Sequence, residues 1–484
     1  MIISRKIGMC LLIVFLCYLI IYLNAKNYGI GISPDSTHYI STADNISSRL
    51  YYSSSITSWD VKEETAWPTL WPPLFPIFLS IFIKLRIFVG ENLFVYLNSS
   101  LWAITVILSW MLLVKLFENL WERILTIFLL NISIGLNYIY LFVWSETLFI
   151  PFILVYILLF DKYRQERSNK YLVLLLLVTS LLPLIKYIGI IFILPILYFF
   201  IQWKIKLWKI VLFIVSITIP LIIVLLLNYF YTGTITGMRL QSQTSFFDNS
   251  KQLFKTIYDC YLLGNFPFFI KEIFIILFVS IFTVGLIKQF RIMNSTFRLL
   301  ILICVAYLIL LILLSTFFWI DQISVRFLSP IFILITILFV KSIAIFKNKT
   351  YLTWCMVFLC LIGTMKSISM TKNSLNNGIG EFSTKEWRSS EIIRFLREQK
   401  YANVIYSNFP DAINYFVNTK TKLITDNPNK VAMMMNKIYK EKAILVILSK
   451  TTYRNVVHQN VLEQYIHDSA NYVFLDGKIY FMKN

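Results

Sequence analysis

Long apolar runs separated by short polar stretches dominate the hydrophobic pattern of this chain. A helix needs about 20 mostly apolar residues to cross a bilayer core of roughly 30 Å. Runs of adequate length predict 11 transmembrane helices, at about 7–25, 93–114, 123–143, 147–160, 170–186, 188–203, 208–230, 271–287, 299–318, 328–346 and 350–367. The pattern therefore predicts a polytopic α-helical membrane protein.

The composition agrees with a chain whose main solvent is lipid. Hydrophobic residues make up 58% of it and charged residues only 14%, whereas a soluble domain carries about 25% charged residues. The net charge of +20 would suggest nucleic acid in a soluble protein. Here Lys and Arg fall mainly in short loops between apolar runs, as the positive-inside rule expects. Nucleic-acid binding is therefore not expected.

One further apolar run, at 74–89, is ambiguous because it begins near three prolines and contains Lys84 and Arg86. If it does not cross and the N-terminus is cytoplasmic, the Lys/Arg-rich loops lie inside. If it crosses, they all move outside, against the positive-inside rule. The run is therefore predicted to be a re-entrant or surface-lying segment of the first outer loop.

This topology predicts outer loops at 26–92 and 231–270 and an extracytoplasmic C-terminal part. We expect a multi-pass protein of the bacterial plasma (inner) membrane, with its N-terminus in the cytoplasm. Two domains are predicted, a transmembrane domain at 1–370 and a small domain at 371–484.

The C-terminal part alternates between predicted strands and helices. Apolar segments at 404–406, 422–425 and 443–448 predict buried strands, and 387–399, 411–417 and 429–442 predict helices. Asp476-Gly477 between 472–475 and 478–482 is typical of a hairpin. This alternation predicts a small α/β domain, and it contains no glycine-rich phosphate loop.

Charged residues at the outer ends of the predicted spans are the candidates for chemistry. Asp35 follows the first span, and Glu146 lies at the outer end of the third. Acids at membrane depth are costly and usually functional, although a single one is also compatible with a solvated cap. Lys186 and Arg326 are cations on the same outer side, where the charge bias does not favour them. They suit an anionic ligand such as a phosphate; the alternatives are a snorkelling lysine and a salt bridge from Arg326 to Asp321.

Three further residues are weaker candidates. His38 and Tyr39 stand one helical turn from Asp35, where they are expected to orient its carboxylate or to touch a sugar. Arg239 lies in the outer loop at 231–270.

Five short motifs in this order resemble the GT-C membrane glycosyltransferases, in particular the protein mannosyltransferase and aminoarabinose-transferase-like branch called family 39. The first loop contains Asp35-Ser-Thr-His-Tyr39 and Pro72-Pro73-Leu74, and the next contains the acid Glu146. Lys186-Tyr187-Ile188-Gly189 and Arg326-Phe327-Leu328-Ser329-Pro330 match the last two motifs. Many relatives carry two adjacent acids in the first loop, whereas Ser36 follows Asp35 here.

The resemblance implies a GT-C-like fold and an inverting glycosyltransferase that uses a polyprenyl-phosphate sugar. Asp35 would act as general base on an acceptor hydroxyl of a glycan, lipid or protein. Lys186 and Arg326, with His38, Tyr39, Tyr187 and Arg239 as further substrate contacts, would bind the donor. Glu146 would either hold a divalent cation, Mg or Mn, together with Asp35, or orient the acceptor. Ser36 weakens the metal interpretation, because oxygen-ligand sites usually need more carboxylates.

Two other functions are compatible with a polytopic chain. A transporter or lipid flippase of the cell envelope would use the outer charges as a substrate path, but such proteins usually show internal repeats and polar residues in mid-membrane. An O-antigen-type polymerase would be expected to have arginine-rich outer loops, and the loop at 231–270 contains one Arg.

Overall fold

The chain forms two compact units in a computed structural model. The structure describes residues 2–86, 90–237, 241–262, 268–290, 294–318, 322–343, 349–399, 403–449, 456–466 and 469–482. The first unit comprises Met1–Asn24, Trp71–Phe75 and Phe94–Asn373. The second comprises Ala25–Leu70, Pro76–Leu93 and Ser374–Asn484.

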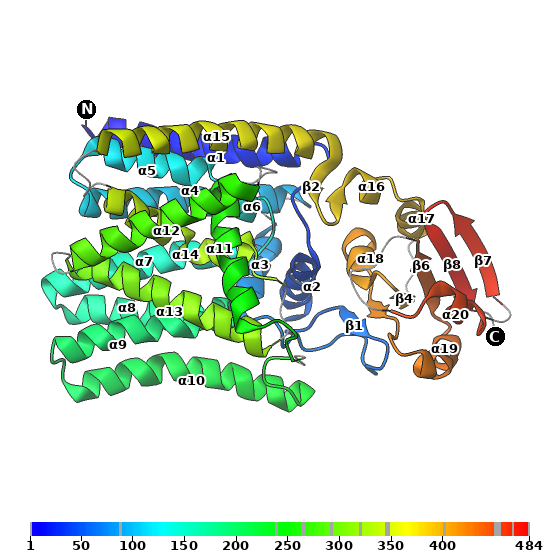
Figure 1. Ribbon diagram of the computed structural model, residues 1–484. Coiled ribbons are helices and arrows are strands. Elements are labelled where there is room, and N and C mark those ends of the chain that lie inside the picture. Colours follow the sequence, from blue (N-terminus) through cyan, green and yellow to red (C-terminus); the bar gives the residue numbers. More distant parts are fainter. Residues whose placement is uncertain are drawn as a thin grey trace. The chain divides into compact units, whose positions relative to one another are not determined.

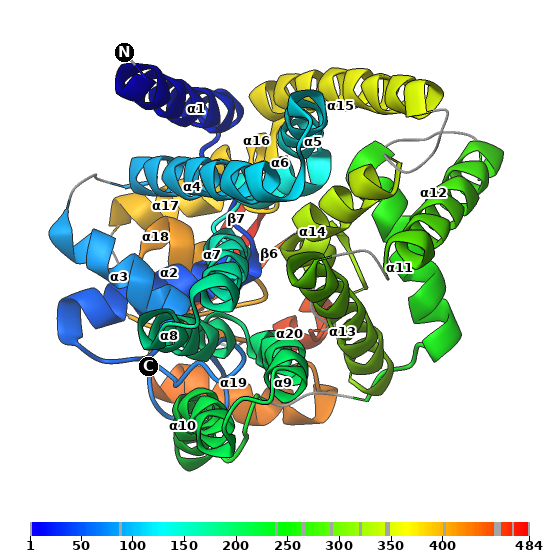
Figure 2. The ribbon, with the colours of Figure 1, turned by 90° about the vertical axis from the view of Figure 1, so that its left-hand side faces the viewer.

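In Figure 1 most helices of the first unit run in a common direction and α11 (Phe246–Leu262) runs across it, and together these helices form a bundle. They are α1 (Ile2–Ala25), α4 (Asn92–Leu116), α5 (Leu120–Ile132), α6 (Ile134–Tyr140), α7 (Glu146–Glu166), α8 (Asn169–Ile185), η1 (Tyr187–Phe192), α9 (Ile193–Gln202), α10 (Leu207–Thr232), α11 (Phe246–Leu262), α12 (Phe268–Phe290), α13 (Ser295–Phe317), α14 (Val325–Ile343) and α15 (Lys349–Asn377). Figure 2 shows α8 between α7 and α10.

Each predicted apolar run coincides with a helix or with two helices in series. The run at 123–143 divides into α5 and α6 at Ser133, and the run at 188–203 divides into η1 and α9. Within the described ranges, four helices, α4, α10, α13 and α14, are long and apolar enough to cross a membrane. The chain is thus a multi-pass membrane protein, as predicted. The amphipathic helix α11 in the second outer loop was not predicted.

The ambiguous apolar run forms a short helix, α3 (Leu74–Leu85). Its 12 residues rise about 18 Å at 1.5 Å per residue, which is well short of the roughly 30 Å hydrocarbon core. The length of α3 therefore agrees with a segment that does not cross the membrane.

The second unit contains a six-stranded sheet in the order β1-β5-β4-β6-β8-β7. The strands are β1 (Ile56–Ser58), β4 (Ile405–Ser407), β5 (Thr421–Leu423), β6 (Ile444–Leu448), β7 (Ser469–Phe474) and β8 (Gly477–Met482). The first four are parallel neighbours, and β8 pairs antiparallel with β6 and β7. All predicted C-terminal strands are present. Gly477 has φ 147°, and a Cβ there would lie 2.1 Å from the Ile447 carbonyl oxygen, so the predicted hairpin needs glycine.

Helices cover the sheet as the alternating pattern predicts. They are α16 (Lys385–Arg388), α17 (Glu391–Gln399), α18 (Pro410–Val417), η2 (Pro428–Lys430), α19 (Val431–Lys440) and α20 (Gln459–Glu463), and a small ribbon of β2 (Gly378–Gly380) and β3 (Ser383–Thr384) precedes them. The core between sheet and helices includes Tyr406, Met434, Ile438 and Leu445.

Most of the predicted first outer loop, 26–92, belongs to this second unit. Its strand β1 pairs in parallel with β5, and its Trp59 side chain joins the core of the C-terminal sheet. The chain passes into the C-terminal part between Asn373 and Ser374, close to the predicted boundary at 370/371. Residues 25–70, which the sequence assigns to the transmembrane domain, group with the C-terminal part instead.

Candidate functional site

A buried carboxylate holds two cations at one end of the helical bundle. Glu146, the first residue of α7, has no exposed side-chain surface. Lys186 Nζ and Arg326 Nε both donate to its Oε1, at 2.5 and 2.8 Å, and Ser145 Oγ donates to its Oε2 at 3.2 Å. Three of the predicted site residues therefore form one cluster, the ionic cluster of Glu146, Lys186 and Arg326.

The sequence around Lys186 determines the backbone conformation at this position. Lys186 is the residue after α8 and has extended backbone angles, φ −152° and ψ 125°. The chain then turns sharply, because the Gly189 amide donates to the Lys186 carbonyl at 2.7 Å. A Cβ at Gly189 would lie 2.5 Å from the Leu182 backbone. Glycine thus permits the close approach of η1 to α8 that fixes the Lys186 backbone.

Arg326 is held by an aromatic ring as well as by Glu146. It lies in the first turn of α14, and its guanidinium carbon is 4.5 Å from the centre of the Trp144 ring. Such cation–π contacts favour arginine over lysine. The ring stacks in turn on Phe142, with the ring centres 4.3 Å apart. The stacking restricts the positions that Arg326 can occupy.

The ionic cluster carries a net charge of +1, from two cations and one carboxylate. Lys186 and Arg326 keep 17% and 16% of their side-chain surface exposed, whereas Glu146 keeps none. Two cations with a common buried counter-ion and some exposed surface favour an anionic ligand. Lys186 makes an ion pair with Glu146, which the predicted alternative of a snorkelling lysine does not describe. The other alternative, a salt bridge from Arg326 to Asp321, stays a prediction. Asp321 itself lies outside the described residues.

Asp35 lies in the second unit, in the first turn of α2 (Pro34–Arg49). Ser33 and Ser36 form a capping box: the Ser36 amide donates to Ser33 Oγ, and the Ser33 amide donates to Ser36 Oγ. Pro34 occupies the first helical position, where its missing N–H costs nothing. Ser36, which stands where many relatives have a second acid, therefore serves to start the helix.

The last two residues of the motif, His38 and Tyr39, are buried. Tyr39 is 3% exposed. The His38 ring approaches Ser54 Oγ with Nδ1 at 3.1 Å and Asp411 Oδ1 with Nε2 at 3.2 Å. Both ring nitrogens of His38 are thus engaged within the second unit, and its role toward Asp35 or a sugar stays a prediction. Asp411, from α18, is a member of this group that sequence reasoning missed.

Tyr187 and Arg239 are the other two predicted substrate contacts. The Tyr187 hydroxyl accepts a hydrogen bond from Asn228 Nδ2 at 3.0 Å, beside the Lys186 turn. Arg239 lies outside the described residues.

The surroundings of Glu146 do not fit a divalent cation. One carboxylate oxygen already binds two cationic side chains, and the other accepts from a hydroxyl. A metal ion would have to displace these cations or be repelled by them. Among the described residues, no three His, Cys, Asp or Glu side chains gather in a metal-type group. The contacts of Glu146 instead fix the positions of Lys186 and Arg326.

A second acid on α2, Asp44, is expected to make the stability of the protein depend on pH. Asp44 is partly buried, and its carboxylate has no hydrogen bond or ion pair with any described residue; burial raises its pKa to about 6. The folded state then holds a proton that the unfolded state, with an ordinary pKa of about 4, releases. Stability is therefore expected to fall as pH rises from about 4 to 6.

Asp44→Asn is expected to remove this pH dependence and to stabilise the protein at pH 7 by about 1–2 kcal/mol. Thermal unfolding of purified protein between pH 4 and 7 measures both effects. Asp60→Asn, at an exposed acid of the same loop, is the matched control and should change neither. A pH profile for Asp44→Asn that matches the wild type would contradict the assignment.

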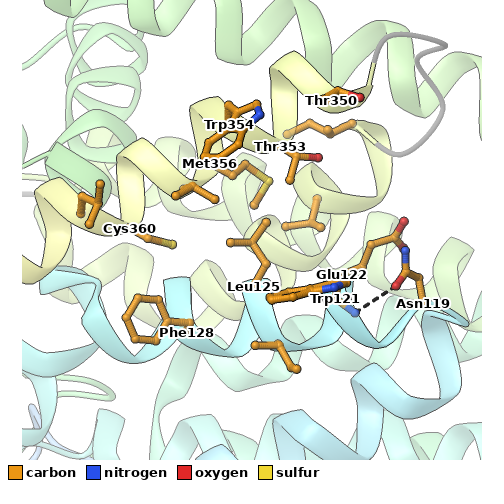
Figure 3. A pocket seen from close by; sticks show the side chains of 15 residues that line it. Asn119, Trp121, Glu122, Leu125, Phe128, Thr350, Thr353, Trp354, Met356 and Cys360 are labelled. Carbon is orange, nitrogen blue, oxygen red and sulfur yellow. Dashed lines mark hydrogen bonds between the residues drawn. The ribbon is translucent and has the colours of Figure 1, made fainter.

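An apolar cavity of about 580 Å³ lies far from the ionic cluster (Figure 3). It is lined by residues of α5, α14 and α15, among them Trp121, Phe128, Trp354 and Cys360. Its α14 residues begin at Val340, 14 positions after Arg326, which is about 21 Å along the helix. The cavity thus opens at the other end of the bundle and is not part of this site.

The fold matches that of a solved protein over nearly its whole length. Two crystal structures of ArnT from Cupriavidus metallidurans, one bound to undecaprenyl phosphate and one in the apo state, align with TM-scores of 0.65 and 0.64. Sequence identity is 10% and 11%, and each alignment covers 98% of both chains. No protein-family model and no curated protein sequence matches the chain. At this identity the likeness shows a shared fold.

Proposed function

We propose that this protein is an inverting glycosyltransferase that transfers a sugar from a polyprenyl-phosphate donor to an acceptor hydroxyl at the outer face of the membrane. The observation that carries the proposal is the ionic cluster, in which a buried Glu146 holds Lys186 and Arg326 with a net positive charge. The fold supports it further, because one matched ArnT structure is bound to undecaprenyl phosphate.

Lys186 and Arg326 would neutralise the phosphate of the donor. Its prenyl chain stays in the lipid, and the phosphate gains negative charge as the sugar leaves. Cations fixed in advance stabilise such charge without the cost of reorganising at the moment of reaction. Glu146 and Trp144 fix them by the ion pairs and ring contact described above. Glu146 thus acts through Lys186 and Arg326.

Asp35 would be the general base. It accepts the proton of the acceptor hydroxyl while the acceptor oxygen forms a bond to the anomeric carbon. The bond between that carbon and the phosphate oxygen breaks, and the phosphate leaves with the electron pair. Attack opposite the leaving group inverts the anomeric centre. One base is enough, because the leaving phosphate needs charge neutralisation more than a proton.

Transfer of label tests this function against a transporter or lipid flippase. Membranes or purified protein are supplied with radiolabelled polyprenyl-phosphate sugar and with extracts of glycans, lipid or protein as acceptors. Movement of label into an acceptor is the expected result. Label that crosses the bilayer but stays on its polyprenyl phosphate would favour the transporter and reject the transferase.

The cations should determine how well the donor is used. Lys186→Ala and Arg326→Ala are each expected to lower kcat/KM for the donor. The loss of transition-state stabilisation should be about 1.5–3 kcal/mol, because each variant removes a charged hydrogen bond. Single-substrate kinetics with the donor varied measure the loss. Lys162→Ala, at a more exposed cation near the other end of α7, is the control. Unchanged donor kinetics in both test variants would remove the phosphate-binding role.

A further inference from the structure

A buried hydrogen-bonded pair connects the segment predicted as the first outer loop to the C-terminal sheet domain. His38 on α2 and Asp411 on α18 lie 3.2 Å apart, with side-chain exposures of 10% and 0%. Both helices belong to the second unit, and Figure 1 shows α18 between α2 and the sheet. The two residues are 373 positions apart in sequence, so the pair closes a very long loop.

The hydrogen bonds around the His38 ring have a defined direction. A carboxylate only accepts, so the Asp411 contact requires a proton on Nε2. In the neutral ring Nδ1 then accepts from the Ser54 hydroxyl, and Ser54 Oγ accepts from the Ile56 amide at 3.2 Å. Backbone bonds between Ser54 and Ala66 fix this segment. Both ring nitrogens therefore have partners, which sets the orientation of the ring and of the helix that carries it.

His38 stands three residues after Asp35 on the same helix. Residues three apart lie on neighbouring parts of one helical face, so a fixed His38 ring limits the rotation of α2 and thereby the direction of Asp35. The start of α2 is anchored to the C-terminal part as well. The Ile32 amide donates to Ser383 Oγ at 3.1 Å, and Ser383 Oγ donates to the Ile30 carbonyl.

We propose that Asp411 of the C-terminal domain is a positioning residue for Asp35, acting through His38 to fix the rotation of α2. The C-terminal domain would then be a working part of the transferase. This inference rests on the proposed function, because it assigns Asp411 to the orientation of the general base. Loss of the pair should misalign the base without changing donor binding.

Kinetics of variants on both sides of the bond test the proposal. Asp411→Ala and His38→Ala are each expected to lower kcat by about 10- to 100-fold, the size of effect that a displacement of about 1 Å can produce. KM for the donor should stay within about twofold, because ground-state binding is unaffected. The double variant should be no worse than either single variant, because both changes break the same contact.

Conservative variants separate positioning from a general loss of structure. His38→Gln keeps a donor toward Asp411, and Asp411→Asn keeps an acceptor toward His38, so each should recover most of the kcat lost in the alanine variant. Should Asp411→Ala fail to fold, the His38→Ala and His38→Gln pair gives the same comparison. Glu64→Gln is the matched control. It removes an acid–base pair to Lys420 between the same two segments, with Glu64 55% exposed, and should leave kcat unchanged.

Hydrogen exchange of the amides at 35–49 adds a readout that needs no enzymatic activity. Exchange in α2 should be faster in Asp411→Ala than in the wild type. Normal kcat and unchanged exchange would overturn the positioning role while leaving the transferase intact. Additive losses, or a raised KM in His38→Ala alone, would also overturn it, because His38 would then contact substrate directly. If exchange in α2 is faster in Asp411→Ala but the wild type transfers no sugar, the sugar-transfer function is rejected. The attachment of α2 to the C-terminal domain is then still supported.

Discussion

Asp35→Asn is expected to abolish detectable sugar transfer while leaving expression and folding intact. Asparagine has nearly the same shape as aspartate but does not accept a proton at neutral pH, and a general base contributes about 10²–10⁴-fold to a rate. Asp35 does not take part in the Ser33–Ser36 capping box that starts α2, so the helix should still form. Transfer by purified enzyme with excess donor measures the loss.

The control for this variant is Asp60→Asn. It makes the same chemical change at an exposed acid of the same outer loop and should transfer at the wild-type rate. Thermal unfolding of both variants checks that the fold is retained. Wild-type turnover by purified Asp35→Asn would exclude Asp35 as the general base.

Glu146→Ala should destabilise the protein and also abolish transfer. It leaves Lys186 and Arg326 facing one another without their buried counter-ion, and removing one member of a buried ion pair typically costs about 3–5 kcal/mol. Repulsion between the two cations should displace the groups proposed to bind the phosphate. Thermal unfolding in detergent and transfer kinetics measure the two effects.

Glu166→Gln is a matched control at the last residue of α7. Glu166 pairs with Lys162 four residues earlier, and both are 46% exposed, so its loss should cost only about 0.3–0.5 kcal/mol. Equal stability losses in the two variants would contradict the distinct role of Glu146. A stable Glu146→Ala variant with normal donor kinetics would show that the cations keep their positions unaided.

Sequence reasoning succeeded where local patterns determine structure. Apolar runs predicted the bundle helices because a bilayer imposes both length and composition. The C-terminal strands at 405–407 and 444–448 were predicted because each is short, apolar and bounded by polar residues. Lys186 and Arg326, which both contact Glu146, were singled out because a cation on the predicted outer side contradicts the usual charge bias. In these cases a few neighbouring residues carry the signal.

The features that sequence reasoning missed depend on distant parts of the chain. Strand β1 has only three residues, Ile56–Ser58, and it exists because β5 offers an edge to pair with. Asp411 begins a helix in which an acid is ordinary, so nothing local indicates its partner His38. The contacts of Glu146 with both cations likewise join residues 40 and 180 positions apart.

The pairing of β1 with β5 has a consequence for the order of events during synthesis. Ile56 pairs with Thr421, which is made 365 residues later, and translation proceeds at about 5–20 residues per second. The first outer loop therefore waits roughly 20–70 s for its partner strand to be synthesised. Helix α2 and Asp35 acquire their final support only when nearly the whole chain has been made. A chain cut short before residue 421 would thus insert its helices yet remain inactive.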